Sequence, residues 1–459
     1  FILRGDVFFH PFPVNGKDIK RQMVASDVIY SLKRIGDDKI GSPGSWVFGF
    51  LDKSKYDRGF ERINDSAIRI YLSRPFPPFL GVLSMQYCSV VLPEVVEYYG
   101  RDFGFHPVGT GPFYLKYWKD GEKLVLRKNP NYFEKDEQGN KLPYLEAVTI
   151  SFIADKQSEF MEFIKGNLDF ISGVHQTYKD ELITRSGKLS PKYASKIKML
   201  TVPYLNTEYL GFLTDTSNPL VKNSPLALKE VRRAIQYGFD REKMMKYLRN
   251  NIGTPALQGF IPKGLPSFSE KLQPYFYSPD SSRALLQRAG FANGKGLPEI
   301  SLMTTSDYLD LCEYIQHELE TVGIKLKIEV STGASFRDMV ANGKLVFFRG
   351  SWIADYPDAE NYLALFYSKN FSPAGPNYFR YSNARFDQLY EESLNCHDFS
   401  KRSLLYRSMD SLIMADAVVI PLYYDQVVRF VASNLEGLGN NALNLLNLKK
   451  AIKTKTSQN

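Results

Sequence analysis

The feature that most constrains this chain is the stretch from Lys344 to Phe366, KLVFFRGSWIADYPDAENYLALF, where a short apolar run gives way to polar residues and then to a helix. The run from Leu345 to Phe348 is typical of a buried strand. Arg349, Trp352 and Asp355 follow it, so a cation, an indole and a carboxylate are expected together just past the carboxyl end of that strand. The stretch therefore joins a core-forming segment to side chains suited to contacting a polar molecule.

The residues before this stretch predict a strand-helix-strand unit. Ile324 to Val330 alternates apolar and polar residues like a strand, and Phe336 to Asn342 has the pattern of a helix that leads into the next strand. Such units form parallel sheets, and open parallel sheets bind ligands outside the carboxyl ends of their strands. The predicted fold class is therefore α/β, with the polar residues at the ligand-binding edge of a sheet.

Six segments spread along nearly the whole chain carry a resemblance to a known family. They are, in family order, Ala25 to Arg34 (ASDVIYSLKR), His106 to Phe113 (HPVGTGPF), Arg127 to Tyr132 (RKNPNY), Val231 to Asp240 (VRRAIQYGFD), Ser351 to Pro357 (SWIADYP) and Val419 to Tyr424 (VIPLYY). They resemble segments of the large extracellular solute-binding proteins, family 5, which deliver peptides and sometimes other solutes to ATP-driven importers. The resemblance implies a two-lobed periplasmic-binding-protein clamshell of type II, in the large peptide-binding class with an extra subdomain.

The resemblance also implies how the chain is divided. Residues 1-105 are expected to form the extra subdomain attached to the first lobe, 106-208 the first lobe, 209-425 the second lobe, and 426-459 the return to the first lobe with a basic tail. The segment at Phe1 resembles one that lies well inside the first lobe of the family. The N-terminal part of that lobe is therefore expected to be missing, together with any export signal or lipid-bearing cysteine.

For the site, the resemblance implies a role for each residue of the polar cluster. Asp355 matches the family aspartate that binds a peptide amino terminus, Trp352 is expected to wall the pocket, and Arg349 matches a carboxylate-binding position of some oligopeptide binders. Charged termini taken out of water need an opposite charge and hydrogen bonds, which these side chains supply. A structural interpretation stays open: Trp352 as core, Asp355 bonded to loop amides, and Arg349 paired with a surface acid. Asp358 is expected to cap the following helix.

Composition and motifs exclude several other classes of function. The formal net charge of +8 allows an anionic partner, but Lys and Arg alternate with Asp and Glu almost throughout, so no nucleic-acid binding is expected. The five histidines and three cysteines stand at no metal-ligand or redox spacing, so neither a metal nor a cofactor is expected. The chain carries no HExxH, GxSxG or phosphate-loop motif, and no enzyme is expected. Paired carboxylates of a hydrolase, which need not be near in sequence, are a remote alternative.

The resulting functional prediction is the substrate-binding component of an ABC importer. It would capture peptides between two lobes as a monomer and deliver them to the membrane permease subunits. The expected location is periplasmic or cell-surface, with membrane anchoring through the missing N-terminal lipoprotein segment. Two alternatives keep the fold: the cargo could be a nickel chelate or an oligosaccharide, or the clamshell could serve as a sensor domain.

Overall fold

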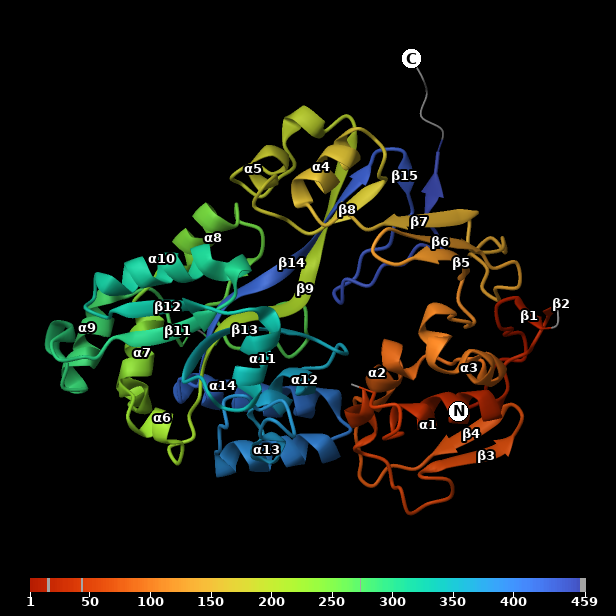
Figure 1. Cartoon of the computed structure of the whole chain (residues 1–459). Coiled ribbons are helices and arrows are strands. Elements are labelled where there is room, and N and C mark those ends of the chain that lie inside the picture. The colour runs from red at the N-terminus through yellow and green to blue at the C-terminus, as the bar shows by residue number, and fades with distance from the viewer. Residues whose placement is uncertain (15–16, 43, 273, 455–459) are drawn as a thin grey trace.

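The structure is a computed structural model, and it describes residues 1–14, 17–42, 44–272 and 274–454 of the 459-residue chain. It is a mixed α/β protein built around one large sheet, with smaller groups of strands and helices beside it (Figure 1). In Figure 1 the large sheet lies left of centre, and the first hundred residues form the red and orange region at lower right. A small three-stranded sheet lies at upper right.

Seven strands form the large sheet. They are β8 (Phe170–Ser172), β9 (Ile197–Phe212), β10 (Thr254–Pro255), β11 (Ile300–Thr304), β12 (Leu326–Val330), β13 (Phe347–Ile353) and β14 (Val419–Ala432). Their order is β10-β14-β9-β13-β11-β12, with β8 paired to β14. β11 is parallel to β12 and β13, whereas the other neighbours are antiparallel. The expected strand-helix-strand unit is confirmed, because helix α11 (Gly333–Ala341) joins β12 to β13.

The strand expected at Leu345 to Phe348 is displaced toward the C-terminus. β13 begins at Phe347 and runs to Ile353, so Arg349 and Trp352 lie within the strand rather than beyond it. The reason is tertiary: β13 pairs antiparallel with β9 along its whole length, which keeps its polar residues extended. Gly350 makes this pairing possible, since a Cβ there would lie 2.4 Å from the ring of Tyr209 on β9.

Two long strands, β9 and β14, connect the large sheet with the upper part of the molecule. They pair antiparallel from Val419 opposite Gly211 to Ala432 opposite Ile197, with register shifts at Pro421/Tyr423 and Tyr424/Gln426. In Figure 1 they run diagonally from the sheet toward β8 and helices α4 (Lys156–Ile164) and α5 (Lys179–Leu182). The boundaries expected between 106-208, 209-425 and 426-459 fall inside these strands, and that division stays a prediction.

Helices cover the large sheet, and others lie below it in the view of Figure 1. They are α6 (Pro219–Lys222), α7 (Lys229–Tyr237), α8 (Arg241–Leu248), α9 (Pro279–Arg288), α10 (Leu309–Glu320), α12 (Glu360–Leu363), α13 (Ala384–Asn395) and α14 (Phe399–Ala415). Asp240 caps α8 by accepting hydrogen bonds from two backbone N–H groups of its first turn. Val231 and Ile235 of α7 are fully buried in one cluster with Leu319 of α10 and Phe347 of β13. Each such apolar side chain contributes roughly 1.5–3 kcal/mol on burial.

The remaining elements belong mainly to the first 200 residues. They are α1 (Ala25–Ile35), α2 (Phe79–Leu83), α3 (Pro93–Tyr99), β1 (Phe12–Val14), β2 (Lys17–Ile19), β3 (Phe60–Asn64), β4 (Ala67–Ile70), β5 (Phe113–Lys119), β6 (Lys123–Lys128) and β7 (Ala147–Ser151). β5, β6 and β7 form the three-stranded antiparallel sheet, and β1 with β2 and β3 with β4 form hairpins. Near the C-terminus β15 (Leu435–Glu436) pairs with β16 (Ile452–Lys453).

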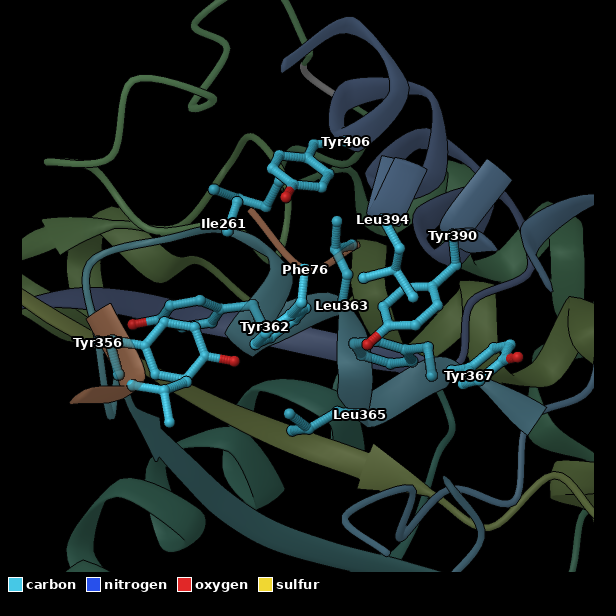
Figure 2. Packing of buried hydrophobic residues seen from close by; sticks show 14 of the residues in the cluster. Phe76, Ile261, Tyr356, Tyr362, Leu363, Leu365, Tyr367, Tyr390, Leu394 and Tyr406 are labelled. Carbon is cyan, nitrogen blue, oxygen red and sulfur yellow. The ribbon is translucent and has the colours of Figure 1, made fainter. Parts of the chain in front are cut away.

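The N-terminal region packs against the helices below the large sheet. Phe76 and Val82 belong to the same buried cluster as Tyr356, Leu363 and many other residues of the region from β13 to α14. Figure 2 shows Phe76 within the packing of this cluster. Contact is close: a Cβ on Gly81 of α2 would lie 3.0 Å from the Cβ of Tyr356. The N-terminal region and the region from β13 to α14 therefore lie face to face, and any space between them has one wall from each.

Candidate functional site

A cavity of about 590 Å3 lies between the N-terminal region and the segment that follows β13. Trp46, Phe50 and Arg74 line it from the N-terminal side. From the other side it is lined by Trp352, Asp355, Tyr356, Glu360, Asn361, Ala364, Tyr367, Asn370, residues 373–376, Tyr378 and Tyr390. Seven of the lining residues are aromatic, and two carboxylates and one guanidinium are among the others. Such a mixture is typical of small-molecule sites, where a few polar groups orient a ligand held by apolar contact.

Asn361 fixes the geometry of the predicted site. Its side-chain Oδ1 accepts hydrogen bonds from the Trp352 indole Nε1 and from the Asp355 backbone N–H, both at 3.0 Å. Its Nδ2 donates to the Asp355 carboxylate Oδ2 at 3.2 Å. One buried amide therefore orients two of the three residues that the sequence predicted at the ligand. Asp358 accepts a hydrogen bond from the backbone N–H of Glu360 at 2.9 Å, but the N-cap of α12 is Ala359 and has no side-chain cap, so the capping role expected for Asp358 stays a prediction.

Asp355 is a half-buried carboxylate without a cation partner in the part of the chain that the structure describes. Burial raises the pKa of Asp355, and the hydrogen bond from Asn361 offsets part of this rise. Across the described residues, no Lys, Arg or His forms an ion pair with it. Arg74 lines the same cavity, but it is exposed and its guanidinium lies 5.3 Å from the ring centroid of Phe50. A carboxylate partly removed from water without a counter-ion favours binding of a cationic group.

Glu360 is a second carboxylate in the same wall, with a different environment. It is 2% exposed, and the hydroxyls of Tyr356 and Tyr390 donate to its two oxygens. Burial raises the pKa of Glu360 to about 7, although the two tyrosine hydrogen bonds act in the opposite direction. Glu360 is thus satisfied by protein groups, whereas Asp355 retains capacity for a ligand.

A second cavity, of about 570 Å3, adjoins the first. Trp352 and Tyr378 line both cavities, so these two side chains stand between them. Arg349 lines only the second. The strand alternation explains this arrangement in part, because β13 carries Arg349 and Trp352 at positions of odd spacing that face different sides of the sheet. The sequence-predicted cluster is therefore distributed over two neighbouring spaces.

Arg349 already has a partner. Its guanidinium forms a buried ion pair with Glu208 of β9 and lies 3.0 Å from the ring centroid of Tyr308. Burial raises the pKa of Glu208, and the charge of Arg349 offsets part of this rise. Nearby, Arg249 pairs with Asp425 at 2.9 Å. Arg349 therefore pairs with an acid, as the structural interpretation expected. That acid, Glu208, is buried and does not lie on the surface.

Sequence reasoning missed Asn361 and Glu208. Asn361 stands six residues after Asp355 in a helix start, and only its hydrogen bonds reveal its function. Glu208 is 141 residues from Arg349, so no local pattern connects them. Among the described residues no group of three or more His, Cys, Asp or Glu is placed to hold a metal ion. A search of those residues also finds no helix with the length and apolarity needed to cross a membrane.

Comparison with known sequences gives a family match over most of the chain. The model of the bacterial extracellular solute-binding proteins, family 5 (middle region), matches residues 1–373. A curated relative is the glutathione-binding protein GsiB of Escherichia coli O6:K15:H31, 26% identical over 384 residues, which are 82% of this chain and 70% of that protein. GsiB of Salmonella typhi is also 26% identical over the same length.

Solved structures share the fold. The periplasmic binding protein DppA of Helicobacter pylori in complex with the peptide STSA has a TM-score of 0.77 at 24% identity, covering 98% of this chain and 86% of that chain. The binding protein AgaA of A. tumefaciens R10 in complex with agropinic acid has a TM-score of 0.76 at 21% identity, covering 99% and 87%. These likenesses confirm the predicted α/β fold, the two-lobed clamshell of type II.

Proposed function

The chain belongs to the bacterial extracellular solute-binding proteins, family 5, and on that premise we propose that it captures a peptide or peptide-like zwitterion between its lobes for an ABC importer. One observation carries the choice of ligand: the Asp355 carboxylate lines a cavity of about 590 Å3, and no cation of the described residues forms an ion pair with it. A ligand ammonium would supply that charge and form charge-assisted hydrogen bonds, which are stronger than neutral ones.

The neighbouring residues have supporting roles in this proposal. Trp352, oriented by Asn361, offers a flat aromatic wall against the ligand chain. Asn361 is a positioning residue, because it fixes the carboxylate that meets the ammonium. Arg349 would contribute from the second cavity, although its charge is shared with Glu208. The aromatic side chains that line the cavity would leave ligand side chains loosely specified.

Capture by a clamshell requires that the ligand favour the closed form. To shift a mostly open population to a mostly closed one, the ligand must bind the closed form better by roughly 5 kcal/mol. An ammonium contact from one lobe and apolar contact from Trp46 and Phe50 across the cavity would supply part of this preference. The closed protein would then dock on membrane permease subunits outside the cytoplasm, where the family acts. A regulatory role for the same closure is the competing proposal.

The ligand assignment is tested by blocking the amino group. Equilibrium dialysis is carried out with a tripeptide library and with the same library N-acetylated, and the bound peptides are identified by mass spectrometry. We expect the free-amine library to be retained and the acetylated one to bind about 10-fold or more weakly, as for loss of a hydrogen bond to a charged group. Asp355→Asn should reduce binding of the free-amine peptides by a similar factor.

A matched control separates this effect from a change in net charge. Asp280, whose side chain is 98% exposed at the start of α9, lies in neither cavity, and Asp280→Asn should leave binding unchanged. Equal retention of the free and acetylated libraries would refute the amino-group assignment. In that case a non-peptide solute, as in the complex of AgaA with agropinic acid, becomes the better hypothesis. Native mass spectrometry of protein purified from cells would then identify the ligand.

A further inference from the structure

A loop near the C-terminus, residues 438–448, lies between β15 and β16 and joins two separate cores of the molecule. Its two ends, Leu438 and Leu448, pack against the small buried cluster around β15 and the end of β14. Its middle, Ala442 and Leu443, packs against the large buried cluster that contains the N-terminal region and the helices below the large sheet. We call this loop the strap, because it is held at both ends in one core and at its middle in another.

Arg429 of β14 fixes the backbone of the strap. Its side chain is 1% exposed, and the guanidinium donates hydrogen bonds to the backbone oxygens of Gly439, Asn444 and Leu445 and to the side-chain oxygen of Asn444. Hydrogen bonds from a charged donor are stronger than neutral ones. The strap therefore cannot move relative to β14 without breaking several strong contacts inside the protein.

Leu205 of β9 connects the strap to the segment that carries Asp355. The backbone N–H of Leu205 donates to the oxygen of Ala442 at 2.8 Å. The backbone oxygen of Leu205 accepts from the N–H of Ala354 at 2.8 Å and from the hydroxyl of Tyr362 at 2.6 Å. Because Ala354 directly precedes Asp355, a single residue of β9 bonds the strap on one side and the ligand-binding segment on the other.

Leu205 also lies where β9 and β14 lose their regular pairing. The register of the two strands shifts here, and residues 204–206 of β9 stand opposite Asp425 alone. Such extra residues disrupt the ladder of hydrogen bonds and bend a strand locally. This irregularity leaves the N–H of Leu205 free to bond the strap instead of β14. The strap thus spans the point at which the two long connecting strands are most able to bend.

We infer that the strap holds the Asp355 segment in place, with Arg429 as its anchor and Leu205 as the link. This rests on the proposed function and deepens it, because it couples bending of β9 and β14 to the position of the carboxylate that meets the ligand. Arg429 and Leu205 line neither the Asp355 cavity nor the second cavity, so both are positioning residues. Hydrogen bonds in a connected series support one another, so loss of the anchor is felt at the far end.

The first test needs no ligand. Hydrogen–deuterium exchange followed by mass spectrometry is carried out on the ligand-free protein and on Arg429→Met, which loses the hydrogen bonds to the strap. We expect residues 204–207 and 353–357 to exchange about 5-fold faster in the variant, because both segments open locally more often. If Arg429→Met does not fold, Asn444→Gly replaces it, since glycine keeps the left-handed φ of 55° and removes only the side-chain acceptor. That variant should speed exchange of the same segments about 2-fold.

The second test measures coupling to Asp355. Equilibrium dialysis is carried out with a tripeptide library that has free amino termini. Arg429→Met should lower the affinity about 3-fold or more, as for loss of one hydrogen bond. In the Asp355→Asn background the same substitution should change the affinity less than about 1.5-fold, because no carboxylate remains to be held. A general loss of stability would instead lower the affinity by the same factor in both backgrounds.

The matched control is Arg232→Met. Arg232 of α7 is likewise a buried arginine that lines neither cavity, and its guanidinium donates to the backbone oxygens of Leu226, Ala227, Asp416 and Ala417. It should leave the exchange of both segments and the peptide affinity unchanged, even where its melting temperature falls as far as that of Arg429→Met.

Three results would overturn the inference: unchanged exchange of the two segments in the anchor variant, the same increase in Arg232→Met, or equal effects of Arg429→Met on affinity in both backgrounds. Failure of the unaltered protein to bind the free-amine library would overturn the proposed function instead. The exchange measurement would still decide whether the strap holds the Asp355 segment.

Discussion

The two cavities contain ionised groups of opposite sign that the protein treats differently. Within the described part of the chain Asp355 has an orienting amide but no cation partner, whereas Arg349 has the buried carboxylate of Glu208. Both residues belong to one seven-residue stretch, and the sequence predicted both as ligand contacts, Asp355 by a direct family match and Arg349 by a match to only some members. The difference is that the partner of Arg349 arrives from a distant strand. A charged residue near a strand end is therefore a ligand candidate only when tertiary structure leaves its charge unpaired.

Removing Glu208 is expected to have the largest effect, because it takes away the partner that distinguishes Arg349 from Asp355. Glu208→Ala would leave the Arg349 guanidinium buried without its counter-ion, and we expect the free energy of unfolding to fall by about 3–5 kcal/mol. Urea unfolding measures the change. The double variant Glu208→Ala with Arg349→Met is the control, and it should be more stable than the single variant because no charge is left unpaired. A double variant no more stable than the single one would show that the unpaired guanidinium of Arg349 is not the cause of the lost stability.

Asn361 is the corresponding residue on the Asp355 side. Asn361→Ala removes three hydrogen bonds, which connect it to Trp352 and to two groups of Asp355, and it should lower the free energy of unfolding by about 2 kcal/mol. Affinity for peptides with a free amino group should fall with it, because the Asp355 carboxylate is no longer held in place. Dialysis and urea unfolding of the same preparation measure both effects.

A matched control for Asn361 exists on α13. Asn395→Ala removes an exposed asparagine whose Nδ2 donates to the backbone oxygen of Glu391 at 2.9 Å. It should change neither the binding of peptides nor the free energy of unfolding by more than a few tenths of a kcal/mol. Equal effects of the two substitutions would contradict a positioning role for Asn361.

The sequence predicted the strands and the helix around this site better than the contacts between them. Apolar periodicity placed β12, α11 and the start of β13 to within a few residues, because local pattern decides those elements. The extension of β13 through Trp352 could not be predicted, since it depends on pairing with β9. The same holds for Glu208, whose approach to Arg349 is a property of the sheet order rather than of any segment.

The site residues show the same limit. The family resemblance pointed to Asp355, Trp352 and Arg349, and all three line the two cavities, but their roles at a ligand stay predictions. Nothing in the chain near Asp355 indicated that Asn361 would bond both Asp355 and Trp352. A helix as short as α12, four residues long, gives no periodic signal from which its inward face could be read. Local propensity thus specifies elements, and packing specifies partners.

Glu360, whose two oxygens accept hydrogen bonds from tyrosines, can be compared with Asp355 through the pH dependence of stability. Its pKa is raised to about 7, above the ordinary glutamate value, so the folded state binds the proton more tightly than the unfolded state. Its contribution to stability is therefore complete at pH values below the ordinary value of about 4.3 and is lost as the pH rises through 7. For one proton the slope is at most about 1.4 kcal/mol per pH unit.

Glu360→Gln should flatten this part of the pH dependence. The amide keeps an oxygen acceptor for one tyrosine and can donate to the hydroxyl oxygen of the other, so the protein should remain folded. Urea unfolding at pH 5, 6, 7 and 8 measures the difference between the two proteins. Asp410 is another buried carboxyl with a pKa raised to about 7, and it is unchanged in both, so its effect cancels in the difference. An unchanged pH profile would contradict the assignment to Glu360.

The smallest effect expected concerns the indole of Trp352. Trp352→Phe removes one N–H donor to Asn361 while keeping most of the aromatic wall, and Asn361 Oδ1 still accepts from the Asp355 backbone. The loss should be about 1 kcal/mol in the free energy of unfolding. Trp118 supplies the control, because its buried Nε1 has no hydrogen-bond partner among the described residues, and Trp118→Phe should cost less than Trp352→Phe on this account. If the two substitutions had equal effects, the hydrogen bond from Trp352 would not contribute to holding Asp355 ready for a ligand, and the aromatic contact alone would explain the residue.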